Sequence, residues 1–235
     1  MAEPARAVRA KTARFYRMRA NVVQVAVELF SRNGYTGTGV ADIGDAAGLA
    51  RGALYYYIGS KEELLAEIHD LVMDPLVAEA EAILALEADF EARIRLLSES
   101  LLWQIVHRHD HVWVFLHEYR HLEGEYRTRF RGKRRHFEEC IMRVLRDGVA
   151  QGFVRATDLR LATLAFLNLH NYTYQWWSDR ESIGVEGLAE FYCGIFLNGV
   201  STGREGSGFE SDLSRGREML GEMRAAAADA DPVSR

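Results

Sequence analysis

Residues 40–57 have the sequence VADIGDAAGLARGALYYY. Their apolar residues recur at the spacing of two short helices that pack at a steep angle around a glycine turn. Gly48 permits the left-handed backbone of that turn, and Gly44 supplies the small residue where the helices approach. Thr38 is expected to cap the first helix and to leave its amide-rich end facing a phosphate. The pattern therefore predicts a helix-turn-helix. Its apolar contacts are expected from Ile43, Ala47, Leu49, Leu54 and Tyr57.

The second helix of this motif is expected at about residues 51–57, with most of its outward side chains within reach of DNA. Arg51, Gly52 and Tyr55 are the candidates for base contacts, because Arg51 can pair with guanine in a bidentate way and Gly52 lets the backbone approach closely. Tyr56 and Lys61 are better placed for phosphates, which fix register without reading sequence.

The charge is divided unevenly along the 235-residue chain, whose formal net charge is −5. Residues 1–61 carry nine Lys and Arg against four Asp and Glu, whereas the remainder carries 20 against 30. A basic head on an acidic body suits a protein that meets phosphate at one end.

A basic arm is predicted over residues 1–19, with a solvated terminus as the equally weighted alternative. It holds Arg6, Arg9, Lys11, Arg14, Arg17 and Arg19. A first helix is expected from about Arg17 to Asn33, where Gly34 ends it.

The segment from Ala20 to Leu65 resembles the DNA-binding domain of the TetR family of bacterial repressors. The likeness is carried by Leu29-Phe30, Gly34-Tyr35, Asp42-Ile43, Ala47-Gly48, Gly52-Ala53-Leu54-Tyr55-Tyr56 and Ser60-Lys61-Glu62-Glu63-Leu64. The resemblance implies an all-helical fold, dimerisation through the last two core helices, and release from the operator when a ligand binds. The sequence departs from the family at Gly44 and Ile58, and at Ala50, where a serine or threonine cap is common. Ala50 in place of a capping residue is expected to lower the stability of the second helix of the motif by about 1 kcal/mol.

The expected fold class is all-α, with a three-helix DNA-binding domain over residues 20–66 and a helical ligand-binding and dimerisation domain over residues 67–200. Residues 201–235 are expected to form a flexible tail with one weak helix near 211–228. In the larger domain, helices are predicted over 61–75, 76–90, 91–108, 110–122, 130–151, 158–178 and 185–200, and Thr157 or Asp158 is expected to cap the sixth of them.

A ligand pocket is predicted in this domain because aromatic bulk and polar groups coincide on a helix that is expected to be buried. The candidate ligand-binding residues are Trp103, Trp113, His117, Arg120, Asn168, Asn171, Tyr172, Gln175 and Trp176. Residues 171–177, NYTYQWW, resemble the corresponding helix of TetR relatives that respond to acyl-CoA or steroid-derived CoA compounds. This resemblance implies a small-molecule effector, with a CoA thioester as one candidate.

Two further patterns carry alternatives. His117-Glu118-Tyr119-Arg120-His121 matches the zinc-protease spacing, so a metal-dependent hydrolase using His117, Glu118 and His121 is the rival function. The basic cluster of residues 127–135 has two interpretations: a solvated helix face, or the entrance of a CoA site that binds the phosphates of the ligand. It consists of Arg127, Arg129, Arg131, Lys133, Arg134 and Arg135.

Two apolar helices near the end of the larger domain predict a homodimer through a four-helix interface, with an intramolecular core as the alternative. The expected partners are thus a double-stranded DNA operator, a small-molecule effector and a second copy of the chain.

We expect no enzyme activity, no cofactor and no membrane partner. Two cysteines without metal or redox spacing, no apolar signal core and no membrane-length apolar run favour a cytoplasmic protein. A helical module whose basic arm binds a membrane or an acidic partner is the second rival. The two apolar helices of the predicted dimer interface carry Leu161, Leu164, Ala165 and Leu169, followed by Leu188, Phe191, Tyr192, Ile195 and Phe196.

Overall fold

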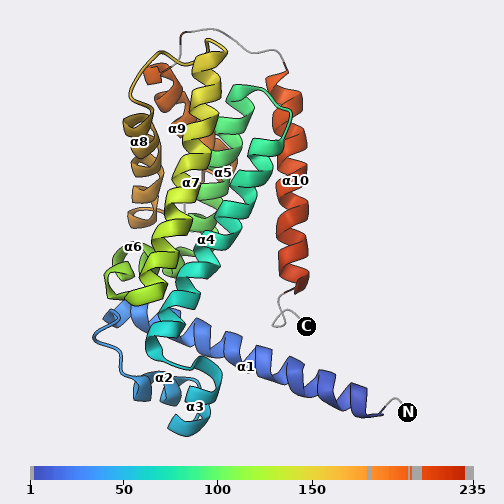
Figure 1. The fold of residues 1–235 in the computed structure, drawn as a ribbon, viewed down its shortest axis with the longest axis vertical. Helices are drawn as coiled ribbons and strands as arrows, with labels where there is room; N and C mark the ends of the chain where they lie inside the picture. Colours follow the sequence, from blue (N-terminus) through green and yellow to red (C-terminus); the bar gives the residue numbers. More distant parts are fainter. Residues whose placement is uncertain (1–2, 179–181, 201, 203–207, 231–235) are drawn as a thin grey trace. The chain divides into compact units, whose positions relative to one another are not determined.

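The described part of the chain is helical, as the sequence predicts, and contains no β-strand (Figure 1). The computed structural model describes residues 3–178, 182–200, 202 and 208–230, with the backbone alone for residues 3–13 and 230. Its α-helices are α1 (Glu3–Asn33), α2 (Val40–Ala46), α3 (Arg51–Ile58), α4 (Lys61–Ala85), α5 (Phe90–His107), α6 (His109–His117), α7 (Gly124–Ala150), α8 (Leu159–Asn171), α9 (Val185–Val200) and α10 (Phe209–Ala230). Two 3-10 helices, η1 (Tyr119–His121) and η2 (Tyr172–Gln175), follow α6 and α8.

The chain divides into two compact units. The head unit comprises Met1–Leu71, Trp113–Phe130 and Arg224–Arg235, and the second unit comprises Val72–Val112 and Arg131–Met223. Residues 113–130 thus belong with the DNA-binding motif, although the sequence placed them in the ligand-binding domain. No described helix has the length and apolarity to cross a membrane.

The head unit is organised around α1, whose buried face runs through Val22, Ala26 and Phe30. Ile43, Leu54 and Ile58 of α2 and α3, with the first turns of α4, complete the same core. Gly34 ends α1 with a φ of 76°, as expected. The start of α1 differs from the prediction, because the helix begins at Glu3 rather than near Arg17. Alanines and long basic side chains, which favour helices, fill this earlier stretch.

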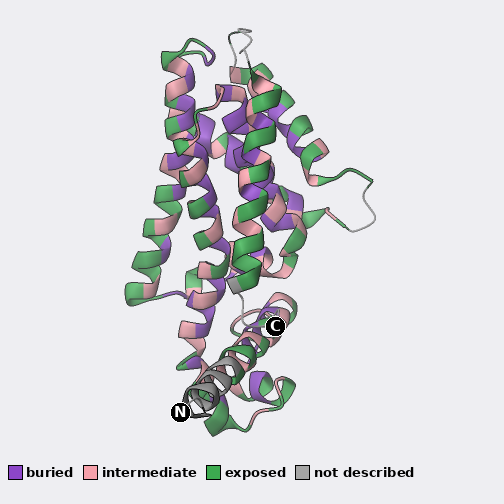
Figure 2. Ribbon diagram, turned by 90° about the vertical axis from the view of Figure 1, so that its right-hand side faces the viewer, coloured by how far each residue is buried: buried purple, intermediate pink, exposed green. Residues whose placement is uncertain are grey.

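In the second unit, α5 has most of its residues buried and packs against α9. Figure 2 shows buried residues on the inward faces of the helices and exposed residues on their outward faces. The predicted helices over 61–75 and 76–90 form the single helix α4, with Pro75 inside it. A proline removes one helical hydrogen bond. Here the helix continues because Val72, Met73 and Leu76 are buried on both sides of that point. Asp158 caps α8 as expected, since its carboxylate accepts from the N–H groups of Arg160 and Leu161.

The helix expected near residues 211–228 of the tail is present as α10, which spans residues 209–230 and is packed rather than weak. Leu213 and Leu220 are buried, and Gly216 lies against Leu96 of α5 so closely that a Cβ atom would stand 2.2 Å from Leu96 Cδ1. Arg217 forms a bidentate ion pair with the buried Glu99 of α5, with a shortest distance of 2.8 Å. These contacts hold α10 although its composition is polar and alanine-rich. Residues 201, 203–207 and 231–235, also part of the predicted tail, lie outside the described residues.

Candidate nucleic-acid interface and ligand-binding residues

The helix-turn-helix is formed by α2 and α3, and its glycines act as predicted. Gly48 adopts a φ of 68° in the turn. A Cβ atom on Gly44 would lie 3.0 Å from the carbonyl oxygen of Leu49 and 3.5 Å from Leu54 Cδ2. Gly44 is therefore the point of close approach, and Ile43 and Leu54 are completely buried beside it. The steep packing presents one face of α3 to the outside.

That outer face of α3 carries four of the predicted DNA-binding residues. Arg51, Gly52, Tyr55 and Tyr56 are all exposed, and Tyr56 is the most exposed of the aromatic residues at 69%. The Arg51 guanidinium carbon lies 5.9 Å from the centre of the Tyr55 ring. The face thus combines a cation, a position without a side chain and two phenols. Contacts between these residues and DNA stay a prediction.

Thr38 does not cap α2, so this prediction is wrong. Gly39 is the N-cap, and its N–H donates to Asp42 Oδ2 over 2.7 Å. Thr38 is fully buried, with its hydroxyl oxygen 2.9 Å from the carbonyl oxygen of Gly34 and 3.3 Å from that of Leu29. Because the hydroxyl donates to the end of α1, it is not available to a phosphate.

Lys61 begins α4 as predicted, but its ammonium group faces the loop after α1. Nζ donates to the carbonyl oxygen of Tyr35 and lies 4.0 Å from the centre of the Tyr35 ring. Burial lowers the pKa of Lys61, and the carboxylates of Glu118 and Asp42 oppose that shift. Lys61 is half-buried and holds the loop after α1 to the start of α4. Its contact with a phosphate stays a prediction.

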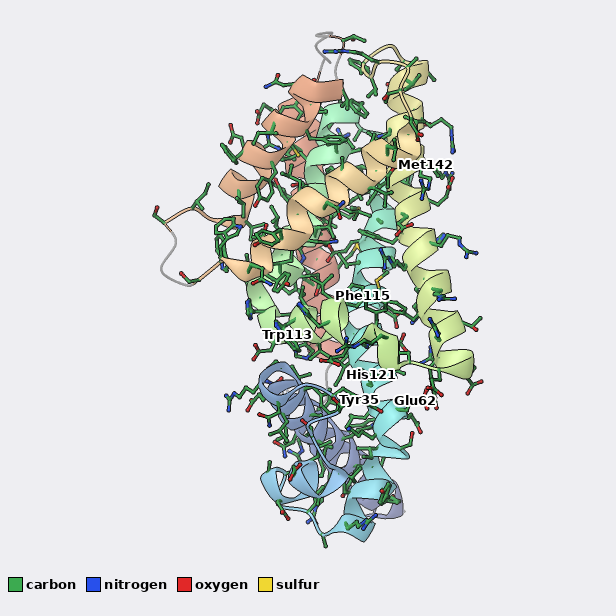
Figure 3. The ribbon with its side chains drawn as sticks, turned by 90° about the vertical axis from the view of Figure 1, so that its left-hand side faces the viewer. Tyr35, Glu62, Trp113, Phe115, His121 and Met142 are labelled. Carbon is green, nitrogen blue, oxygen red and sulfur yellow. The ribbon has the colours of Figure 1, made fainter. Side chains whose placement is uncertain are left out.

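A polar clasp, consisting of Tyr35, Glu62, Glu118, His121 and Glu123, joins residues 113–130 to the rest of the head unit. The rings of Tyr35 and His121 stack with centres 5.0 Å apart, and His121 Nε2 lies 3.3 Å from the buried carboxylate of Glu118. The N–H of Glu123 donates to Glu62 Oε1 over 2.8 Å. Burial, followed by the charges of Glu62 and Glu123, raises the pKa of Tyr35. Figure 3 shows Tyr35, Glu62 and His121 together at this point.

The zinc-protease pattern is not presented by one helix. Helix α6 ends at His117, whose ring stacks on Trp113 with centres 4.4 Å apart, and His121 lies in η1 against Tyr35. Among the residues that the structure describes, no group of three or more His, Cys, Asp and Glu side chains is arranged to hold a metal ion. The geometry therefore gives the hydrolase alternative no support.

The predicted ligand-binding residues fall into both units. Trp113, His117 and Arg120 belong to the head unit, where Arg120 is exposed with Nε 3.3 Å from His121 Nε2. Trp103 belongs to the second unit, where it is half-buried and stacks on His107 with ring centres 4.6 Å apart. The other five lie on α8, η2 and the residue after η2.

The expectation that this last group lies on a buried helix is wrong. Helix α8 ends at Asn171, and Asn168, Tyr172, Gln175 and Trp176 are exposed. Asn171 is half-buried. Asn168 and Tyr172 share a helical face with Leu161, which is 57% exposed. These polar residues are therefore solvated rather than directed into the core of the second unit.

The buried polar groups of the second unit are different ones. His170 Nδ1 donates to the carbonyl oxygen of Phe166 over 2.7 Å, so its Nε2 accepts from the hydroxyl of Ser98 at 2.6 Å. Thr173 and Tyr192 share a hydrogen bond of 2.9 Å between their hydroxyls. Burial lowers the pKa of His170 to about 4. A serine–histidine pair can support nucleophilic catalysis, but Ser98 and His170 are both 0% exposed and serve here as a buried hydrogen-bonded pair. Sequence periodicity places residues on a face, and it gave no signal for these cross-helix pairs.

The basic cluster of residues 127–135 is largely exposed on α7, and three of its six cations pair with carboxylates. Arg129 lies 2.8 Å from Asp70, and Lys133 pairs with Asp74. Arg134 lies 3.1 Å from Glu138 one turn along its own helix. This arrangement agrees with a solvated helix face.

A helix-turn-helix with an exposed basic and aromatic recognition face, joined to a second helical unit, defines a DNA-binding transcriptional regulator. Residues 22–68 match the family of bacterial regulatory proteins of the tetR type, and residues 87–200 match the tetracyclin repressor-like C-terminal domain. The chain belongs to the TetR family of transcriptional regulators.

Several known proteins resemble the chain over most of their length. It is 30% identical over 186 residues to the transcriptional repressor KstR2 of Rhodococcus jostii, covering 78% of this chain and 91% of that protein. The regulator PfmR of Thermus thermophilus has 32% identity and a TM-score of 0.70, covering 75% of this chain and 97% of its own. AibR, crystallised with isovaleryl coenzyme A and operator DNA, has 25% identity and a TM-score of 0.67, covering 76% of this chain and 97% of its own.

Proposed function

We propose that this regulator is a homodimeric repressor that binds a near-palindromic operator and leaves it when a CoA thioester binds the second unit. The observation that carries the proposal is its likeness to the repressor KstR2 over 91% of that protein's length. The complex of the related AibR with isovaleryl coenzyme A and operator DNA supports a CoA thioester as the effector class. Such a regulator acts in the cytoplasm, where bacterial DNA lies.

The dimer is supported by an apolar surface on α8 and α9. Leu161, Phe191 and Ile195 are 57%, 58% and 51% exposed. Leu188, Tyr192 and Phe196, on an adjacent face of α9, are buried in the second unit. Large apolar residues that share an outward face are typical of an interface, and two helices from each subunit can form a four-helix interface. Two recognition helices would then face successive major grooves about 34 Å apart.

The proposed mechanism is a population shift. The effector stabilises a form of the dimer in which the spacing of the two heads does not fit the operator, to the extent that it binds this form better. The polar clasp supports a role for residues 113–130 in this coupling, because it fixes them to the recognition motif within the head unit.

DNA binding is tested by enriching duplexes from a random-sequence pool with the purified protein and measuring their affinity. Arg51→Ala is expected to weaken binding to the enriched duplex by about 1–3 kcal/mol per half-site and to relax the selectivity at one base pair. Arg32→Ala, an exposed residue at the end of α1, is the matched control. Failure of the wild-type protein to enrich any sequence would contradict the proposal.

The effector is tested with a panel of straight-chain, branched and steroid-derived CoA thioesters, with free CoA and the free acids as controls. A thioester that raises the melting temperature should also release the enriched duplex, and the coupling should be reciprocal. A thioester that raises the melting temperature without changing the affinity for DNA would contradict the proposed mechanism.

The dimer is tested by sedimentation of the wild-type protein and of the double variant Phe191→Ser/Ile195→Ser. The substitutions remove exposed apolar surface, so they should produce monomers that remain folded. Dimers of unchanged strength in this variant would place the interface elsewhere.

A further inference from the structure

The first part of α1 lies outside the region that the family match covers. The match begins at residue 22, whereas α1 begins at Glu3. Residues 4–27 contain six basic residues and no acidic residue. Helix propensity explains why this segment is helical, but it does not explain why all of its charged residues are basic beside a DNA-binding motif.

Phe15 attaches this part of α1 to the recognition helix α3. Its ring centre lies 5.4 Å from that of Tyr56, nearly perpendicular to it, and 5.2 Å from that of Tyr57. Aromatic pairs at such distances contribute about 0.5–1.5 kcal/mol each beyond the area they bury. Arg19 fixes the same segment a second time, because its guanidinium lies 2.9 Å from the carboxylate of Glu67 on α4. Residues 15–19 are thus held against both α3 and α4.

Arg14 and Arg17 flank the Phe15 contact and are exposed. They stand three positions apart, so their side chains leave the same side of the helix. Within the part of the chain that the structure describes, no carboxylate pairs with either of them. Tyr56, the ring on which Phe15 packs, belongs to the exposed face of α3. When α3 enters a major groove, as the proposed function requires, an arginine beside this ring faces the backbone phosphates that border the groove.

We infer that residues 14–19 form a second DNA-contacting element, in which Phe15 is a positioning residue and Arg14 and Arg17 bind backbone phosphates beside each half-site. The inference rests on the proposed function, since it requires a DNA-binding head. Its ligand is the sugar–phosphate backbone, so the element adds affinity and fixes register without reading base sequence.

The test is the salt dependence of binding to two probes, a duplex enriched by the wild-type protein and the unselected random-sequence pool. Each phosphate contact contributes about 0.9 to the slope of log affinity against log salt concentration. Arg14→Ala/Arg17→Ala should therefore lower that slope by about 1.8 per subunit on both probes, with base selectivity retained. Arg143→Ala/Arg160→Ala, which removes two exposed arginines from the second unit, is the charge-matched control and should leave the slope unchanged.

The role of Phe15 has its own readout. Phe15→Ala removes no charge, yet it should lower the salt slope toward that of the double arginine variant because the segment loses its anchor. Phe15→Tyr should restore the slope, and combining Phe15→Ala with the two arginine substitutions should add little. A purely structural role would change the melting temperature and leave the slope unaltered.

Two outcomes would overturn the inference. One is an unchanged slope in Arg14→Ala/Arg17→Ala while the wild-type protein still enriches a specific duplex. The other is an unchanged slope together with loss of binding to vesicles of anionic phospholipid, which would assign the segment to a membrane surface. Failure of the wild-type protein to enrich DNA would instead count against the proposed function, so the two failures are distinct.

Discussion

The core of the head unit and the core beneath α8 and α9 are built from different interactions. In the head unit, apolar side chains such as Phe30, Ile43 and Leu54 fill the interior between α1, α2 and α3. In the second unit, His170 pairs with Ser98, and Thr173 pairs with Tyr192, in the interior between α5, α8 and α9. Apolar packing tolerates changes of pH, whereas buried histidine remains satisfied only in its neutral form. The two units should therefore respond differently to truncation, whereas both should lose stability in acid, because the head unit also buries a histidine, His69.

The largest effect is expected from Phe30→Ala in the head unit. Phe30 is completely buried, and phenylalanine-to-alanine substitutions in cores cost about 3–5 kcal/mol of unfolding free energy. Urea unfolding measures the loss. Hydrogen exchange should show that the amides of α5 and α9 keep their protection. The exposed Arg32→Ala on the same helix should cost less than about 0.5 kcal/mol. A similarly small cost for Phe30→Ala would mean that the head core is not packed as described.

The next effect is the acid sensitivity of the second unit. The pKa of His170 falls from 6.5 to about 4 on burial, so between these values the unfolded chain binds a proton that the folded chain does not. The stabilisation is complete above pH 6.5 and is lost as the pH falls toward 4, to a total of roughly 3 kcal/mol. Burial also lowers the pKa of His111 to about 4, which adds to the dependence of the second unit. The pKa of His69 is lowered in the same way to about 4, which gives the head unit an acid dependence of its own.

His170→Phe separates these contributions. Phenylalanine fits beside the rings of Phe166 and Tyr192, but it leaves the Ser98 hydroxyl without its acceptor, at a cost of about 1–3 kcal/mol at neutral pH. The variant should also lose one part of the acid dependence. Thermal unfolding from pH 7.5 to pH 4.5 measures both effects. An unaltered pH profile would show that His170 is not the neutral, buried group described above.

A smaller effect is expected from Glu99→Gln, which removes the carboxylate charge opposite Arg217. Glu99 is buried, but the Arg217 side chain is 34% exposed, so solvent screening reduces the loss to about 1–2 kcal/mol. Hydrogen exchange should show faster opening of α10, while the amides of α2 and α3 keep their rates. Equal exchange of α10 in both proteins would mean that Leu213 and Leu220 alone hold it.

The smallest effect concerns the polar clasp in the head unit. A double-mutant cycle with Tyr35→Ala and His121→Ala should give a coupling energy of about 0.5–1.5 kcal/mol, the usual range for aromatic pairs. The matched cycle combines Tyr35→Ala with Arg120→Ala, which is exposed and lies next to His121 in η1. Equal coupling in both cycles would show that the Tyr35 and His121 rings have no specific interaction.

The same contrast explains what could be predicted from the sequence. The helix-turn-helix was predictable because Gly44, Gly48 and the apolar residues around them act through local spacing. Thr38 was misassigned as a helix cap, and the contact of Lys61 with Tyr35 was not predicted, because partners distant in the sequence determine where these polar atoms point. The periodicity of α8 predicted its apolar face, but it could not show that Asn168 is exposed while His170 is buried and paired across the fold with Ser98.

Ala50 gives the recognition helix an incomplete beginning. The residue takes the N-cap position of α3, but no side chain accepts a hydrogen bond there. The first amide groups of α3 therefore depend on solvent in the free protein, and an anion is the partner that such a helix end favours. In exchange experiments, the backbone of Arg51 and Gly52 should be the part of the motif whose protection rises most on operator DNA. Because the cap is missing, amide protection at the start of α3 should report whether DNA is bound to this helix.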